Sequence, residues 1–375
     1  MANSKSVDQD AVLRARMMLL GSGRRSLREE VQAYRVLVRV SPRAYLGKLA
    51  TALVSYAYAP EFKERPEIVF ALCKEAVEAA REVEVDEPRR AEVLVRALGA
   101  YERELFVAGR REEGLAACQE AAEAGREGFA RGHVVSAGYG SVRLGVVLAE
   151  EGRYVEAAEV SGRELGDSVW ALLRHAGNLE AAGRHAAASE VFRRLVDGRR
   201  RALAAREASS ASVLWALVQY SRMAGTTGAG AVRAEALGLL KELAVGGERG
   251  GWSDAVPFWK TLLALSARSL EPGDSPAPAF GTDVVLWSPD VRRAWFAGLG
   301  ELEREAADPH CGLRRLGVVQ HRLTIRSVLH HENRTLRMEQ VLLPMFDRSV
   351  ELARELGDGE WLARVLTDRA MFLVA

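Results

Sequence analysis

Five residues that can bind a transition metal lie close together near the C-terminus. They are His310, Cys311, His321, His330 and His331. Imidazole and thiolate groups are the usual ligands of zinc, so a metal centre is the first chemistry to consider. The spacing argues against it, because a zinc-binding H-E-x-x-H helix starting at His331 needs a second histidine where the chain has Thr335. We therefore predict no metal and no cofactor, with this cluster as the sharpest chemical alternative.

Two glycine-containing stretches look like parts of catalytic or nucleotide-binding motifs. Residues 138–143 begin like a dinucleotide-binding loop, but Arg143 stands where the third glycine belongs and no strand pattern precedes it. Residues 251–255 resemble a nucleophile elbow, but Ala255 replaces the final glycine, and Ser253 is better explained as a helix N-cap. We therefore predict no catalytic residues and no enzyme activity.

Two arginine-rich stretches, residues 193–206 and 314–337, could meet phosphate groups. No helix-turn-helix, zinc finger or base-stacking module accompanies them, and the formal net charge of the chain is only +1. We interpret both stretches as solvated helix surfaces and do not expect nucleic acid as a partner.

The composition is that of a globular protein, with 48% hydrophobic and 27% charged residues in 375. Cys73, Cys118 and Cys311 are odd in number and far apart, which favours a reducing compartment over a disulfide framework. No uncharged apolar stretch approaches the roughly 20 residues that a membrane-spanning helix needs. These features predict a cytoplasmic protein with no membrane partner.

The apolar residues recur at helical spacing along the whole chain. Leu46, Leu49 and Leu53 form one such stripe, and breaks such as Ser41-Pro42 separate one helix from the next. The pattern predicts an all-α fold of antiparallel helical hairpins.

The clearest organisation lies in residues 138–197, where two hairpins repeat one pattern. Their turn glycines, Gly152 and Gly183, are 31 residues apart. Further turn glycines are expected at Gly109 and Gly225, each accepting the left-handed conformation that ends one helix before the next begins. A hairpin cannot bury its own apolar face, so such units stack into an array.

Residues 138–197 resemble tetratricopeptide (TPR) repeats, and residues 95–125 and 211–245 resemble them more weakly. The resemblance covers about half of the chain, and its repeats are degenerate in length. It implies a superhelix of antiparallel hairpins, an α-solenoid, in which the first helix of each hairpin lines a concave groove.

In register with the turn glycines, seven residues are candidates for this partner-binding groove. They are Arg96, Arg103, Tyr139, Trp170, Trp215, Gln219 and Arg222. Arginine and aromatic side chains are favoured at interfaces because they offer large contact areas with polar groups. The alternative for each residue is core packing between hairpins. The lysine pattern with which some family members hold a C-terminal carboxylate is absent, since Leu173 and Trp215 stand at two of its positions.

The predicted organisation has four parts. They are N-terminal helices (1–40), the TPR-like array (41–270), a Pro-rich linker (271–288) and C-terminal helical repeats with a cap (289–375). The last helix either caps the array or offers its uncovered face as a homodimer contact.

Two functions fit these features. The first is a non-catalytic scaffold that binds a peptide or helix of a partner protein in the groove. The second is a ligand- or peptide-responsive regulator that resembles the sensor regions of bacterial peptide-responsive transcription regulators. Because it lacks their N-terminal DNA-binding segment, such a regulator would act through a separate output partner.

Overall fold

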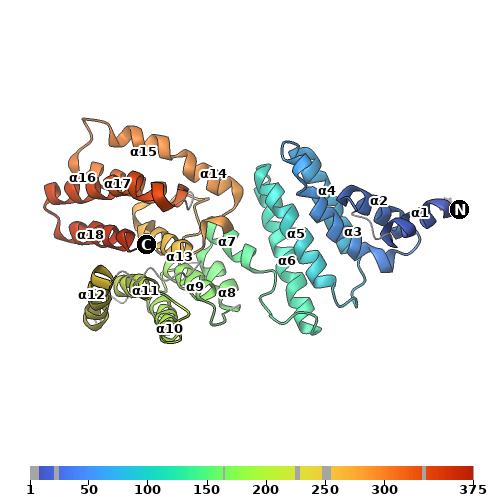
Figure 1. Ribbon diagram of the computed structural model, residues 1–375, viewed down its shortest axis with the longest axis horizontal. Helices are drawn as coiled ribbons and strands as arrows, with labels where there is room; N and C mark the ends of the chain where they lie inside the picture. The colour runs from blue at the N-terminus through green and yellow to red at the C-terminus, as the bar shows by residue number, and fades with distance from the viewer. Residues whose placement is uncertain are drawn as a thin grey trace. The chain divides into compact units, whose positions relative to one another are not determined.

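The computed structural model describes residues 8–20, 25–163, 165–223, 229–246, 255–331 and 335–374. Every regular element in these ranges is a helix, and they contain no strand. Helices that follow one another in the chain pack against one another, mostly as antiparallel pairs (Figure 1). The prediction of an all-α fold with sequential helix packing is therefore confirmed.

The chain forms two compact units. The first unit comprises Met1–Val147 and Ser288–Asp290, and the second comprises Leu148–Trp287 and Val291–Ala375. The division falls inside α7 (Val142–Glu150) and again inside α14 (Pro289–Ala297). The boundaries at residues 40, 270 and 288 remain predictions from the sequence.

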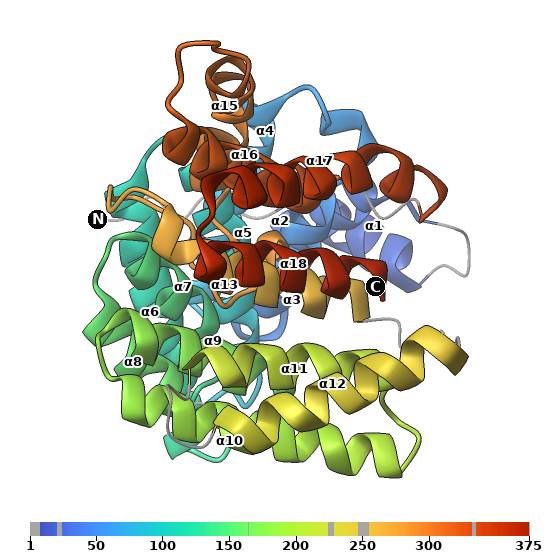
Figure 2. The same ribbon diagram turned by 90° about the vertical axis from the view of Figure 1, so that its left-hand side faces the viewer.

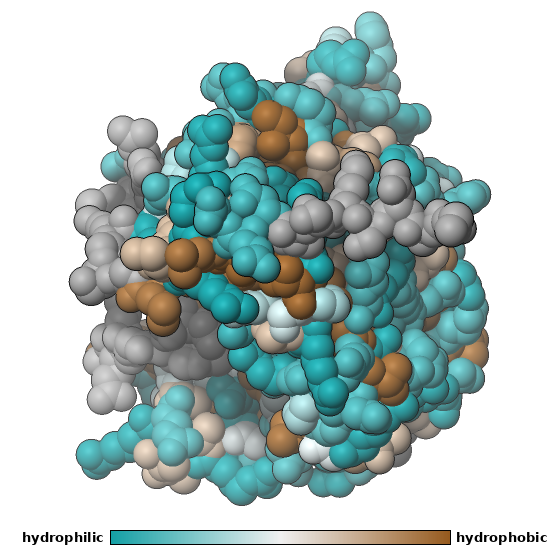
Figure 3. Space-filling model, turned by 90° about the vertical axis from the view of Figure 1, so that its right-hand side faces the viewer, coloured by the Kyte–Doolittle hydropathy of each residue, from teal (hydrophilic) through white to brown (hydrophobic). Residues whose placement is uncertain are grey.

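The first unit is built from successive helices around a main apolar core, with two smaller apolar clusters. Its elements are α1 (Gln9–Leu20), α2 (Leu27–Val38), α3 (Pro42–Ala57), η1 (Pro60–Phe62), α4 (Pro66–Arg81), α5 (Arg90–Val107) and α6 (Arg111–Ala130). Leu53, Cys73 and Leu98 are fully buried in that core. Figure 3 shows a face of the molecule that is mostly hydrophilic, with apolar groups between the polar ones.

The second unit holds the remaining helices and the segment after α13. Its elements are α8 (Tyr154–Arg163), α9 (Val169–Ala181), α10 (His185–Ala204), α11 (Ser210–Met223), α12 (Ala229–Gly246), α13 (Ala255–Ala267), η2 (Arg268–Leu270), η3 (Val284–Leu286), α15 (Leu299–Ala306), α16 (Leu313–His330), α17 (Thr335–Leu356) and α18 (Gly359–Leu373). In Figure 2, α18 lies above α11 and α12, and α13 lies behind it.

The turns between paired helices have one repeated geometry. Gly109, Gly152 and Gly183 each have a φ of +73°, the left-handed region that an L side chain rarely adopts. After each glycine, the next N–H donates to a carbonyl five residues earlier: Arg110 to Leu105, Arg153 to Leu148 and Arg184 to Leu179, at 2.8–2.9 Å. The predicted turn conformation is confirmed at these three glycines, whereas Gly225 lies outside the described residues.

Residues 271–288 were predicted as a Pro-rich linker, and the part that lies in the second unit packs against Glu150 at the end of α7 and against α9. The Ala277 N–H donates to the Glu150 carbonyl at 2.9 Å. A Cβ atom on Gly177 of α9 would lie 3.0 Å from the Phe280 carbonyl oxygen, so a larger residue would require the segment to shift by a few tenths of an ångström. The segment thereby positions Phe280 and Glu271 beside α9 and η2.

Candidate functional site

The second unit contains an open cavity of about 1340 Å³. Its walls are contributed by α8, α9, α11, α12, α13, η2, the segment after η2, and α18. Ala236, Leu237 and Leu240 line it from α12, and Ala363, Leu366 and Met371 line it from α18. The cavity therefore has two apolar walls on helices that are far apart in the chain.

The apolar walls expose side chains that water solvates poorly. Leu237 of α12 is 56% exposed and Leu366 of α18 is 39% exposed. Full burial of a leucine side chain is worth about 1.5–3 kcal/mol, so a ligand that covers both gains affinity from them. Among the described helices, α12 packs extensively only along α11, which leaves its other side to the cavity.

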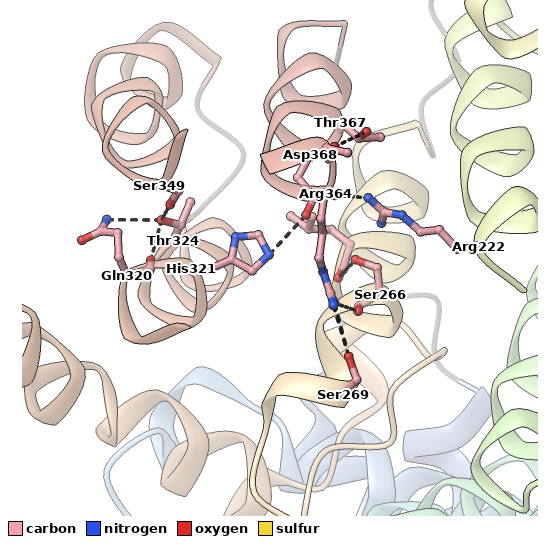
Figure 4. Close-up of polar contacts among 12 residues, drawn as sticks. Arg222, Ser266, Ser269, Gln320, His321, Thr324, Ser349, Arg364, Thr367 and Asp368 are labelled. Carbon is pink, nitrogen blue, oxygen red and sulfur yellow. Dashed lines mark hydrogen bonds and ion pairs between the residues drawn. The ribbon is translucent and has the colours of Figure 1, made fainter. Parts of the chain in front are cut away.

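The polar part of the site is organised by α18. Asp358 begins this helix as its N-cap, with its side chain accepting hydrogen bonds from the N–H groups of Glu360 and Trp361. Arg364 and Asp368 are four residues apart and therefore lie on the same face of α18. That face points toward η2 and α11 (Figure 4).

Asp368 is a fully buried carboxylate held by two basic groups. Arg222 Nη2 donates to its Oδ1 at 2.8 Å, and His321 Nε2 lies 3.3 Å from its Oδ2 (Figure 4). Burial opposes ionisation of Asp368, but the charge of Arg222 and the contact with His321 outweigh it and lower the pKa of this carboxyl below its usual range. Asp368 is therefore ionised at neutral pH and fixes the position of Arg222.

Arg364 is half-buried and makes its hydrogen bonds to neutral acceptors. Its guanidinium donates to the Ser266 carbonyl and, at 3.3 Å, to Ser269 Oγ. Burial lowers the pKa of Arg364, the charge of Asp368 raises it, and the neighbouring Arg222 lowers it further. Arg364 is thus a partly desolvated cation with no carboxylate bonded to it among the described residues.

A second cation and two acids lie on the side of η2. Arg268 lies over the ring of Tyr154, with Cζ 4.7 Å from the ring centroid. Burial raises the pKa of Glu180, although the charges of Arg268 and His185 oppose that shift. Glu271 is already held by Arg322 and Arg326, at 3.0 and 2.6 Å.

Three of the predicted groove residues lie in the first unit. Arg96 is exposed on α5. Arg103 is exposed, with its guanidinium 5.8 Å from the ring centroid of Tyr58. Tyr139 is half-buried, and burial, with a smaller contribution from Glu92, raises the pKa of its hydroxyl. These three residues do not line the cavity of the second unit, so their role as one groove surface stays a prediction.

The other four predicted groove residues lie in the second unit. Gln219 and Arg222 line the cavity. Trp215 is only 1% exposed, and its indole N–H donates to the Met371 carbonyl at 3.3 Å. Trp170 packs edge-to-face on Phe258, with ring centroids 6.1 Å apart.

Trp215 therefore has the alternative role of core packing, because it is buried on α11, which packs against α10, α12 and α13. Trp215, Gln219 and Arg222 share one face of α11 at helical spacing, and both Trp215 and Arg222 bond to α18. Arg364, Leu237 and Leu366 also line the cavity, but they were not predicted from the sequence. The local signal available was the sequence of α12, which carries leucines on more than one side.

The His and Cys residues near the C-terminus do not converge. His321 is buried beside Asp368 and Trp361, whereas the ring of His330 lies against Phe296, with centroids 4.9 Å apart. Within the described ranges, no three His, Cys, Asp or Glu side chains are placed to hold a metal ion. No helix in the same ranges is long and apolar enough to span a membrane.

The two arginine-rich stretches are largely engaged by carboxylates. Arg193 bonds to Glu190 and Asp197, and Arg200 bonds to Asp197 and Glu235. In the second stretch, Arg315 contacts Glu305, and Arg322 and Arg326 share Glu271. These pairs neutralise much of the positive charge that a phosphate backbone would need.

The buried thiols are poorly suited to nucleophilic chemistry. Burial raises the pKa of Cys73 to about 12, with a smaller contribution from Glu104. Cys118 is also buried, with its thiol 3.7 Å from Glu102 Oε2. Neither thiol lies in the cavity.

Comparison with models of known protein families and with curated protein sequences finds no match for this chain.

Proposed function

We propose that this protein is a non-catalytic interaction scaffold that binds a peptide or helix of a partner protein in the cavity of the second unit. The observation that carries the proposal is the cavity itself, about 1340 Å³ between apolar walls on α12 and α18, with charged groups along one side. Apolar anchors beside a few fixed polar groups are the usual composition of a peptide-binding groove.

The repeated turn geometry supports a TPR-like array as the architecture behind this function. Gly109, Gly152 and Gly183 share one φ value and one hydrogen-bond pattern, as equivalent turns of stacked hairpins do. Within the groove predicted from the sequence, Gln219 and Arg222 are the residues that we retain as partner-binding, since they line the cavity.

Site-specific photo-crosslinking in the native cell tests this function. A crosslinking amino acid placed at Leu237 or at Leu366 should capture the same partner, because the two positions face one cavity. Val155 on α8 is the matched control, since it is also 56% exposed but does not line the cavity. Capture of different proteins at the two positions, or equal capture at Val155, would exclude a partner seated in the cavity.

The ligand-responsive regulator remains a second candidate. It is favoured by the polar cluster of Arg222, Asp368 and Arg364 beside the cavity, which suits the carboxylate of a small ligand. Native mass spectrometry of protein purified from its own cells should then reveal a bound small molecule that is lost in Arg364→Gln. Observation of the bare chain mass alone would argue against this candidate.

A further inference from the structure

The first unit contains a smaller pocket, of about 490 Å³, that the function proposed above does not use. It lies between α2, the end of α3, η1 and the first half of α4, and we call it the first-unit pocket. Ligand pockets in proteins typically measure about 300–1,000 Å³. The first-unit pocket therefore has the size of a site for a small molecule.

Aromatic and aliphatic side chains line the less exposed part of the first-unit pocket. Phe62 and Leu72 are buried, whereas Tyr56 and Ile68 are half-buried. The ring of Tyr56 packs edge-on against the ring of Phe62, with centroids 4.9 Å apart. Because this contact holds both rings in place, an apolar group that enters the pocket meets a preformed surface.

Arginines outnumber acids around the first-unit pocket. Among the described residues, Arg28, Arg35 and Arg65 line it against one carboxylate, Glu61. Arg35 is already neutralised, because its Nε and Nη2 donate to the two carboxylate oxygens of Glu75 at 2.7 and 2.5 Å. Without that pair, two arginines remain against one acid, which is an excess of one positive charge.

The remaining acid and the cations meet at the aromatic side of the pocket. The Tyr56 hydroxyl donates a hydrogen bond to Glu61. Burial, and then this bond, raise the pKa of Tyr56, whereas the charges of Arg28 and Arg35 lower it. The positive charge of α2 therefore acts directly beside the Tyr56 ring, where an apolar group would lie.

Arg28 and Arg65 reach the pocket from two separate elements. Arg28 lies in the first turn of α2, and Arg65 directly precedes α4. Both are exposed, and neither side chain bonds to a carboxylate among the described residues. Each guanidinium presents its N–H groups as a planar fork that matches an oxyanion, so the two arginines form a two-point site for one.

We propose that the first-unit pocket binds a small organic monocarboxylate, with its carboxylate between Arg28 and Arg65 and its apolar part against Tyr56. A single excess positive charge matches a carboxylate better than a phosphate group, which carries about two negative charges at pH 7. This site is separate from the cavity of the second unit and does not depend on peptide binding there.

Ligand-observed NMR on the full chain tests this assignment, with phenylacetate as the probe. Phenylacetamide is the matched uncharged probe, since it has the same apolar part. Phenylacetate should bind about fivefold more tightly than the amide or better, because charge-assisted hydrogen bonds are stronger than neutral ones. Its dissociation constant should rise about tenfold or more in the Arg28→Gln, Arg65→Gln double variant, which loses two such bonds.

Two further variants separate charge recognition from loss of folding. Glu61→Gln removes the acid that repels the probe but keeps an acceptor for the Tyr56 hydroxyl, so it should tighten binding of phenylacetate by about threefold. A damaged fold would not produce this gain. Arg43→Gln is the matched control, because Arg43 is an exposed arginine of α3 that pairs with Glu84 outside the pocket, and it should leave the affinity unchanged.

The possible outcomes are decisive for this site and independent of the proposed function. Equal affinity for phenylacetate and phenylacetamide, or unchanged affinity in the double arginine variant, would overturn the assignment. Absence of phenylacetate binding at millimolar concentration would overturn it as well. Leu237→Asp alters the cavity of the second unit and should leave phenylacetate binding as in wild type, so failure of either proposal leaves the other standing.

Discussion

Arg222 and Asp368 are 146 residues apart in the chain, yet Arg222 Nη2 lies 2.8 Å from Asp368 Oδ1. The carboxylate is fully buried, whereas the arginine remains partly open to the cavity. This ion pair joins α11 to α18, and it lies beside the apolar walls that we propose as the binding surface. The stability of the second unit and the shape of its cavity therefore depend on the same two residues.

Replacing Asp368 with asparagine should destabilise the second unit by about 3 kcal/mol, because Arg222 and His321 then lose their anion in a buried site. All seven tryptophans, from Trp170 to Trp361, belong to the second unit. Tryptophan fluorescence during urea unfolding therefore reports on that unit.

Asp347→Asn is the matched control for this prediction. Asp347 bonds to Arg369 of α18 at 2.6 Å, but the side chain of Arg369 is 34% exposed and that of Asp347 is 45% exposed. Its loss should cost less than about 1 kcal/mol, as for other surface pairs. Equal losses for the two variants would show that the Arg222–Asp368 pair does not hold α18 in place.

Glu180→Gln should stabilise the second unit at neutral pH and have no effect in acid. Burial raises the pKa of Glu180 in the folded state, so its ionisation at neutral pH opposes folding. Below the unfolded pKa of about 4.5, both states are protonated and glutamine resembles the neutral acid. The urea midpoint of the variant should therefore exceed that of wild type at pH 7, and the difference should disappear as the pH falls below that value.

A stabilisation by Glu180→Gln that is the same at pH 4 and pH 7 would contradict this assignment. The opposite pH dependence applies to Asp368, whose folded pKa is lowered. Its contribution to stability is present above the unfolded pKa of about 3.8 and is lost as the pH falls through the lower folded value.

Gly183→Ala should destabilise the second unit by about 1 kcal/mol, because an L side chain is strained at a φ of +73°. A Cβ atom at Gly183 would meet no other atom within 4 Å, so the cost comes from the backbone alone. Gly300 in α15 has the same free space without a positive φ, and Gly300→Ala should stabilise by up to about 1 kcal/mol. Thermal unfolding followed by circular dichroism should therefore shift in opposite directions for the two variants.

The sequence predicted the local features of this fold well. The left-handed turns at Gly109, Gly152 and Gly183 were predictable because each is encoded by one residue between two apolar stripes. The capping box between Ser26 and Glu29 is a local feature of the same kind, since its partners are three residues apart.

The cavity was only partly predictable, because it depends on contacts between distant segments. Gln219 and Arg222 were identified from their position on α11, but nothing near them in the sequence indicates that Trp215 and Arg222 form hydrogen bonds with α18. Arg364 gave no signal either, since its environment is created by Ser266 and Ser269, about 95 residues earlier. Helix periodicity identifies an apolar face and leaves its partner undetermined.

The exposed leucines of the cavity should be dispensable for folding and required for binding. Leu237→Asp should change the free energy of unfolding by no more than about 0.5 kcal/mol, because the side chain is 56% exposed. Leu265→Asp should instead destabilise by several kcal/mol, since this cavity-lining leucine is only 3% exposed and its replacement buries a charge. Urea unfolding gives the two stabilities, and partner capture from position 366 gives the binding. If Leu237→Asp retains full stability and full capture, the wall formed by α12 does not contact the partner, and the binding surface must be limited to α18 and η2.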